Sequence, residues 1–117
     1  MHNFKELIVW QKSRALVKEI YLLTKKFPKD ETFGLVQQVR RAVVSVASNI
    51  AEGSGRGTDA DFSHFLDIAL GSVYEVETQI ILSSDLDYIT NDEFESVNQK
   101  INEVERLLIS FKKTIKK

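Results

Sequence analysis

The sequence contains no cysteine, one proline, five glycines and two histidines among its 117 residues. The lack of cysteine excludes disulfides and thiolate metal sites, and nothing ties the chain to an oxidising compartment. A di-iron helical bundle needs two Glu-x-x-His motifs, whereas here only "DFSH", which ends at His64, comes near. With no cysteine and only two histidines, the sequence also lacks the usual nucleophile–base pairs of enzymes. We therefore expect no metal, no cofactor and no enzymatic activity.

Long apolar runs are also absent. No stretch approaches the roughly 20 apolar residues that a membrane helix needs, and the N-terminal stretch lacks the apolar centre of a signal peptide. The hydrophobic content of 43% is enough to bury one sizeable core. These features predict a cytoplasmic protein without a membrane segment, with a single domain over residues 1–117.

Positively charged lysine and arginine are absent from a long segment, residues 58–95. Residues 58–95 hold ten acids and no lysine or arginine, whereas residues 1–29 and 96–117 are both basic, and the net charge is only −1. A total so close to zero argues against strong non-specific binding of nucleic acid. The segregation would instead let acidic and basic helices attract one another, within one chain or between subunits.

Apolar residues recur at steps of three and four through most of the chain, which predicts helices. The first helix covers roughly residues 6–27 and ends before Pro28, which cannot continue a helix. A second helix follows, with Asp30 and Glu31 suited to its positive N-terminal end. Gly53 is expected to end it, because glycine enters the left-handed conformation without steric cost.

Two further helix starts are marked by capping residues. Thr58 with Asp61 resembles a capping box and opens the third helix, and Thr90 with Glu93 forms a regular one before the fourth. Short connections between four such helices favour antiparallel neighbours. We predict an all-α fold, an antiparallel up-down-up-down four-helix bundle.

The loop "GSGRGT" between the second and third helices invites a phosphate-binding interpretation. A P-loop, however, needs a preceding strand and a Gly-Lys-Ser/Thr ending, and both are absent. Asp59 and Asp61 would also repel an anion at this helix start. A plain connection is favoured, with an anion site at Arg56 as the alternative.

The polar side of the second helix carries short side chains that are poor helix formers, which suggests close packing rather than open solvent. Glu52 lies near the negative end of the helix dipole, so a cation such as Arg56, or one from another helix, should be its partner. Three interpretations remain open: a network between helices or subunits, a surface for a ligand or nucleic acid, and a solvated face. The residues of this side are Gln38, Arg41, Ser45, Ser48, Asn49 and Glu52, with Arg40 at its border.

A second apolar stripe lies outside the core stripe of the third helix and consists of Leu70, Tyr74 and Ile81. Gly71 and Ser72 beside it would allow a close backbone approach. Such a stripe is more typical of an oligomer interface than of a ligand groove. We expect Leu70, Tyr74 and Ile81 to contact another subunit together with the polar side of the second helix. The cations best placed for a phosphate or an acidic partner are Arg40, Arg41 and Arg56.

Six short segments form a combination that is specific to one protein family. They are "VWQ" (9–11), "FP" (27–28), "FGL" (33–35), "QVRRA" (38–42), "SNIAEG" (48–53) and "ALGS" (69–72). With these segments the chain closely resembles the four-helix-bundle family named after reading frames in intervening sequences of bacterial 23S ribosomal RNA genes. The resemblance covers nearly the whole chain. One departure is Ala47, where family members often have proline, so the kink that this proline would introduce is not implied here.

The resemblance implies fold and assembly more than activity. Family members form antiparallel four-helix bundles that assemble into rings, typically pentamers, and have no established enzymatic role. A similar fold serves as the accessory protein of diversity-generating retroelements, a basic pentamer associated with a reverse transcriptase and nucleic acid, whereas this chain is nearly neutral. We therefore expect a non-enzymatic, ring-forming scaffold that associates with RNA or with a partner protein. The alternative is a small-ligand-binding protein or an enzyme that uses the polar side of the second helix.

Overall fold

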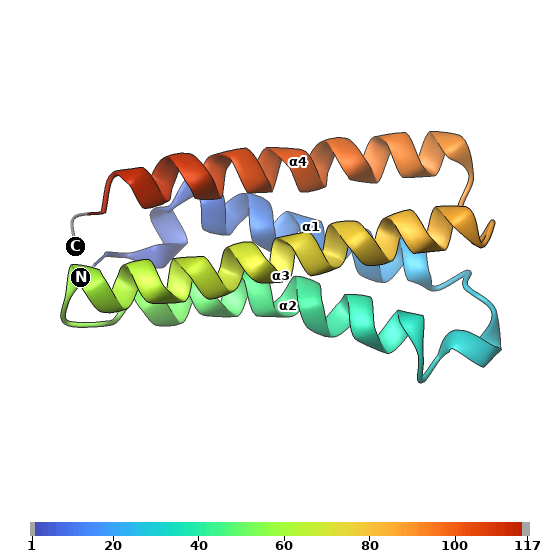
Figure 1. Ribbon diagram of the computed structural model, residues 1–117, viewed down its shortest axis with the longest axis horizontal. Coiled ribbons are helices and arrows are strands. Elements are labelled where there is room, and N and C mark those ends of the chain that lie inside the picture. Colours follow the sequence, from blue (N-terminus) through green and yellow to red (C-terminus); the bar gives the residue numbers. More distant parts are fainter. Residues whose placement is uncertain (1, 116–117) are drawn as a thin grey trace.

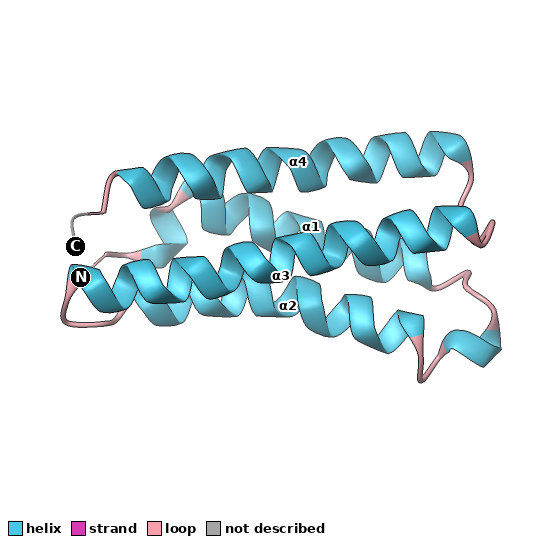
Figure 2. Ribbon diagram, viewed as in Figure 1, coloured by secondary structure: helices cyan, strands magenta, loops and turns pink. Residues whose placement is uncertain are grey.

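The computed structural model describes residues 2–115, and within this range it contains helices and no strand (Figures 1 and 2). Two short 3-10 turns, η1 (Phe4–Glu6) and η2 (Lys29–Glu31), precede the first and second α-helices. The four α-helices are α1 (Ile8–Thr24), α2 (Leu35–Ser54), α3 (Asp59–Asp85) and α4 (Asn91–Lys113). The predicted all-α class is confirmed.

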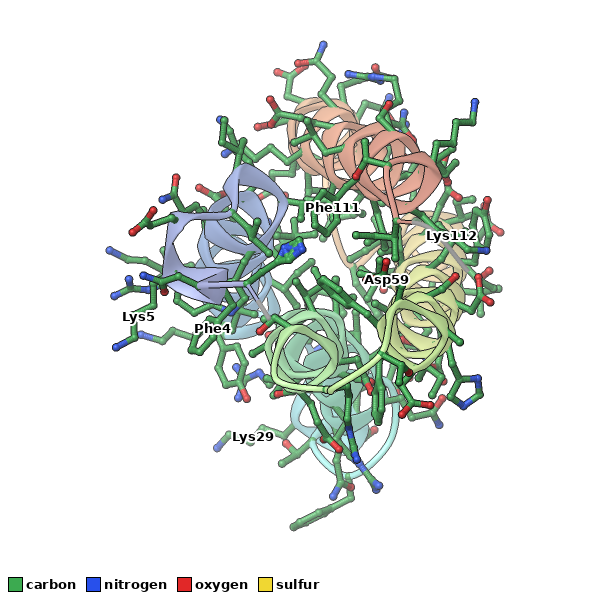
Figure 3. The ribbon with its side chains drawn as sticks, turned by 90° about the vertical axis from the view of Figure 1, so that its left-hand side faces the viewer. Phe4, Lys5, Lys29, Asp59, Phe111 and Lys112 are labelled. Carbon is green, nitrogen blue, oxygen red and sulfur yellow. The ribbon has the colours of Figure 1, made fainter. Side chains whose placement is uncertain are left out.

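Consecutive helices run antiparallel and pack side by side, and α4 closes the bundle against α1 (Figure 1). Seen from one end, α1 and α3 lie at opposite corners of the bundle, with α2 and α4 at the other two corners (Figure 3). The molecule measures 43 × 25 × 20 Å. This arrangement is the predicted up-down-up-down bundle, in which short connections make sequence neighbours into spatial neighbours.

The core is formed by the apolar stripes that the helical spacing predicts. Leu16, Ile20, Ile50, Leu66 and Ile101, contributed by all four helices, are at most 2% exposed and belong to one cluster. Burying a side chain of this size stabilises the fold by about 1.5–3 kcal/mol. The same spacing leaves polar residues on the outside, where ion pairs join neighbouring helices. These pairs are Lys12–Glu103 and Glu19–Lys100 between α1 and α4, Lys26–Glu93 between the turn after α1 and α4, and Asp67–Lys112 between α3 and α4.

The predicted N-terminal caps of α3 and α4 are present in the structure. The Thr58 side chain accepts a hydrogen bond from the Asp61 backbone N–H at 3.1 Å, so α3 begins at the next residue, Asp59. At α4 the box is complete, because Thr90 accepts from the Glu93 N–H and the Glu93 carboxylate accepts from the Thr90 N–H. Each cap satisfies backbone groups that a helix end leaves unpaired.

The first two helices are shorter than expected. The first α-helix ends at Thr24 rather than at residue 27, and α2 begins at Leu35 instead of directly after Pro28. The backbone at Gly34 is not helical, which separates Glu31 from the first turn of α2. Glu31 nevertheless caps this helix from outside, since its carboxylate accepts the Leu35 N–H at 3.1 Å. An acid therefore does act at this helix start, but from the preceding turn.

Gly53 does not end α2 in the left-handed conformation, and this part of the prediction is wrong. No glycine in the described range has a positive φ, and α2 continues to Ser54. Gly53 is buried against α3, where an added Cβ would lie 2.7 Å from the Phe65 Cβ and 2.9 Å from a ring carbon of Phe62. The glycine is required because two helices approach closely, and not because the chain turns.

Glu31 also accepts a hydrogen bond from the Tyr88 hydroxyl at 2.7 Å, which links the start of α2 to the loop before α4. The bonds from Tyr88 and from the Leu35 N–H lower the pKa of Glu31 below its usual value of 4.5. The carboxylate therefore stabilises the folded state above that pH, and the contribution is lost as the pH falls through the lowered pKa.

We expect Glu31→Gln to be less stable than the unmodified chain at neutral pH, with a difference that shrinks below pH 4.5. Urea unfolding at several pH values measures this difference. Asp30→Asn is the matched control, because Asp30 makes no side-chain hydrogen bond or ion pair with the described residues. A difference for Glu31→Gln that stays constant down to pH 2 would contradict the expected linkage.

None of the described helices is both long enough and apolar enough to cross a membrane.

Candidate functional site

The polar side of α2 packs partly against α3 through short hydroxyl and amide side chains. The Ser45 and Ser72 hydroxyl oxygens lie 2.9 Å apart in hydrogen-bond contact. The Asn49 side-chain amide donates to the Ser45 hydroxyl at 2.9 Å and to the Ser45 carbonyl at 2.8 Å. Short side chains fit here because longer ones would hold the two helices apart. A polar contact between helices therefore exists within a single chain.

A polar groove lies next to this contact, between α2 and α3. It has a volume of about 380 Å³. Gln79, which is buried on α3, donates to the side-chain oxygen of Gln38 at 3.4 Å, and its own side-chain oxygen has no partner among the described residues. The lining residues of this α2–α3 groove are Gln38, Arg41, Ala42, Ser45 and Glu75.

The arginines predicted to bind an anion do not form one site. Arg40 donates to the Thr24 hydroxyl at 2.9 Å and to the Tyr21 carbonyl at 3.2 Å, and its guanidinium stacks over the Tyr21 ring at 4.5 Å. These contacts place it between α1 and α2, where its guanidinium is engaged within the chain. Arg41, in contrast, is exposed at the α2–α3 groove and makes no side-chain hydrogen bond or ion pair with the described residues.

The third of these arginines, Arg56, lies in the loop after α2. It pairs with the Glu52 carboxylate at 2.7 Å, and its guanidinium stacks over the Phe65 ring at 4.6 Å. The cation that Glu52 needs at the negative end of the helix is thus supplied by Arg56. An anion at Arg56 would have to compete with this carboxylate, so the loop is a poor phosphate site.

The apolar stripe on α3 is largely on the surface. Leu70 is half-buried against the core, whereas Tyr74 is 45% and Ile81 is 44% exposed. Sequence reasoning missed Ile68 and Leu82, which lie on α3 and are exposed to a similar extent. Positions 68 and 82 are two heptads apart, so they lie on nearly the same side of the helix, and this period could have identified Ile68 and Leu82 as a pair.

Gly71 lies on the same helix and is exposed, with no atom within 4 Å of where a Cβ would stand. An exposed glycine in a helix is less favourable than alanine by roughly 0.5–1 kcal/mol. Nothing within the described part of this chain requires a glycine at that position. It differs in this respect from Gly53, whose neighbours leave no room for a side chain.

The described residues contain no group of three or more His, Asp or Glu side chains that could hold a metal ion. At the α2–α3 groove the side chains offer amide, hydroxyl, guanidinium and carboxylate groups, which bind by hydrogen bonds and charge. Ser45 contacts Ser72 and Asn49, and neither can act as a base toward its hydroxyl. The two side chains that Ser45 contacts therefore supply no base for its hydroxyl.

Sequence reasoning missed two polar residues of α3 at this groove. Glu75 is an exposed residue that lines the groove, and Gln79 is buried and bonds to Gln38 of α2. Positions 68, 72, 75 and 79 follow steps of three and four residues, so their side chains lie on one side of α3. Polar residues on this side of α3 indicate that the helix packed against it is also polar. The sequence alone does not show which residues of α2 they contact, because that depends on the packing of the bundle.

Comparison with known proteins places the chain in a family. The family model of the 23S rRNA-intervening sequence protein matches residues 5–110. A similar solved structure comes from Bacteroides thetaiotaomicron and is described as a protein of unknown function from the S23 ribosomal protein family. It is 32% identical, with a TM-score of 0.82 over 92% of this chain and 100% of the other. No match was found among curated proteins. Together with the antiparallel bundle, the match over residues 5–110 shows that this chain belongs to the 23S rRNA-intervening sequence protein family.

Proposed function

We propose that the protein is a non-enzymatic scaffold that assembles into a ring of identical subunits. The observation that carries this proposal is the exposed apolar surface of α3, where Tyr74 and Ile81 are nearly half-exposed beside Gly71. Large apolar side chains gathered on one helix usually mark a contact with another protein. The resemblance described above suggests five subunits, and the cysteine-free sequence is consistent with action in the cytoplasm.

Native mass spectrometry at micromolar concentration tests the assembly. The expected result is a single species at a multiple of the 13.4 kDa chain, with five as the expected multiple. Ile81→Asp should shift the population toward the monomer, because it places a charge within the apolar contact. Phe33→Asp is the control, since Phe33 is 88% exposed in the loop before α2, away from this stripe. An unmodified chain that stays monomeric throughout would refute the scaffold.

The scaffold would carry either an RNA or a protein partner, and Arg41 is the cation that supports the RNA version. Arg40 and Arg56 are engaged within the fold, whereas Arg41 is exposed at the α2–α3 groove. RNA binding through Arg41 predicts an affinity that falls steeply with salt and weakens in Arg41→Glu but not in Arg40→Lys. If RNA does not bind, or binds without dependence on salt, the RNA partner is rejected and a protein partner remains as the proposal.

The α2–α3 groove also supports a second candidate, the binding of a small polar ligand. Its volume of about 380 Å³ suits a small molecule. The unpartnered side-chain oxygen of the buried Gln79 lies next to Gln38, a lining residue, and would accept a hydrogen bond. Mass spectrometry of the purified protein under native conditions would detect a retained metabolite. A mass equal to that of the bare chain, or to a multiple of it, would count against this candidate.

A further inference from the structure

We propose that neighbouring subunits join through the outer face of α1 in one copy and the outer face of α3 in the next. The inference rests on the proposed self-assembly and adds which surfaces meet and in which arrangement. Two observations support it: these faces carry opposite charges, and they lie on opposite sides of the molecule.

The outer face of α1 is cationic. Its members recur at steps of three and four and are all exposed. Lys12 and Lys26, nearer to α4, are already paired with Glu103 and Glu93, whereas the cations of this face make no ion pair with the described residues. The outer face of α1 consists of Gln11, Arg14, Lys18 and Leu22, and it is extended by Lys25, the C-terminal cap residue of the helix.

The outer face of α3 combines acids with apolar side chains. The helix has no lysine or arginine, so nothing on α3 itself neutralises these acids. Asp67 is already paired with Lys112 of α4, but Glu75 and Asp85 make no ion pair with the described residues. The outer face of α3 consists of Gly71, Tyr74, Glu75, Thr78, Ile81, Leu82 and Asp85.

The two faces match in length as well as in charge. Arg14 to Lys25 and Tyr74 to Asp85 each extend over eleven residue steps, which is about 16 Å at 1.5 Å per residue. Each face also contains an exposed apolar side chain, which is Leu22 on α1 and Ile81 on α3. Contact would therefore bury apolar surface and bring unlike charges together over a common length.

The positions of the faces determine the kind of assembly. Helices α1 and α3 lie at opposite corners of the bundle (Figure 3), so a contact between them leaves one free α1 face and one free α3 face at the two ends of a dimer. Such a contact is heterologous and produces a ring when its rotation closes. A two-fold dimer would instead place like charges opposite each other, α1 on α1 or α3 on α3, which is unfavourable.

Gly71 supplies an independent indication. It leaves a gap on the outer face of α3, and nothing in the described chain occupies or requires that gap. A neighbouring helix that approaches closely would account for it, as α3 accounts for Gly53 in α2. Ala15 is the small exposed residue on α1 beside the cationic face.

Cross-linking tests the inference directly, because the sequence has no cysteine and therefore no background reaction. Lys18→Cys and Thr78→Cys are prepared as separate single-cysteine chains, mixed, and treated with a short bis-maleimide linker. A cross-linked pair that contains one chain of each kind is expected in the mixture, and little from either chain alone. Gln99→Cys, an exposed position on α4, replaces Thr78→Cys in the control mixture.

The double variant Lys18→Cys/Thr78→Cys extends this test. In a heterologous ring it should give a ladder of linked chains that stops at the number of subunits. Native mass spectrometry of the same samples separates the two proposals. Assembly with cross-links only between identical positions would overturn the α1–α3 contact and leave the scaffold standing, whereas a monomer would overturn both.

Charge reversal gives a second measurement. Arg14→Glu/Lys18→Glu should weaken assembly about tenfold or more, because like charges then face each other. Combining these changes with Glu75→Lys/Asp85→Lys reverses both faces and should restore assembly. Lys29→Glu, in η2 and outside both faces, is the control for a single charge reversal elsewhere on the surface and should leave the assembly unchanged. Equal weakening by the control, or no rescue by the combined variant, would overturn the contact.

Discussion

Leu66→Ala should lower the free energy of unfolding by about 2–5 kcal/mol. Leu66 is completely buried in the core stripe of α3, so truncation removes apolar contacts and leaves a cavity that rigid neighbouring helices fill only in part. A domain of this kind is stable by only about 5–15 kcal/mol, so the loss is a large fraction of the total. Urea unfolding at a fixed protein concentration measures it.

Leu86→Ala is the matched control, because Leu86 follows α3 and is 53% exposed. Its loss should stay within about 0.5 kcal/mol, as expected for a surface position. Similar losses for Leu66→Ala and Leu86→Ala would mean that the core is not where the bundle places it.

Gly53→Ala should destabilise the protein by about 1–3 kcal/mol, although alanine is the better helix former. The added methyl group would lie 2.7 Å from the Phe65 Cβ, an atom fixed to the backbone of α3, so the two helices would have to move apart. The measurement is the urea midpoint at a protein concentration at which the variants have the same assembly state.

Gly71→Ala provides the comparison for this prediction, since Gly71 is also a helical glycine but has no neighbour within 4 Å. At a dilution at which the subunits are separate, it should raise stability by about 0.5–1 kcal/mol. Opposite signs at the two glycines are the expected result. If both variants were stabilised, α2 and α3 would not be as close as the structure places them.

Features that depend on local sequence could be predicted. The heptad spacing of α3 and α4 defines their buried sides, and Thr58 and Thr90 mark helix starts, because both signals act within one turn of the chain. The bundle then follows from short connections. The position of Glu31 outside α2 and the packing role of Gly53 were not predicted, because both depend on groups reached through folding. These groups are the Leu35 N–H beyond a non-helical glycine and the Phe65 Cβ on another helix.

The candidate site was less predictable for the same reason. The periodicity of α2 places Arg40 and Arg41 on its polar side or at its border, but only the packing shows that Arg40 binds Thr24 of α1 while Arg41 lines the α2–α3 groove. A helical wheel gives a direction around one axis and not the identity of the neighbour. Gln79 was missed because its partner, Gln38, is 41 residues away in the sequence.

The contact between Ser45 and Ser72 also determines how far α2 can slide along α3. Apolar side chains pack without strict direction, so a purely aliphatic seam would tolerate a shift of about one helical turn, near 5.4 Å. Such a shift would separate the two hydroxyl groups and leave each without this partner, which is costly in a partly buried position. Together with the close approach at Gly53, the pair therefore favours one axial register of the two helices, much as a single polar residue fixes the alignment of a coiled coil.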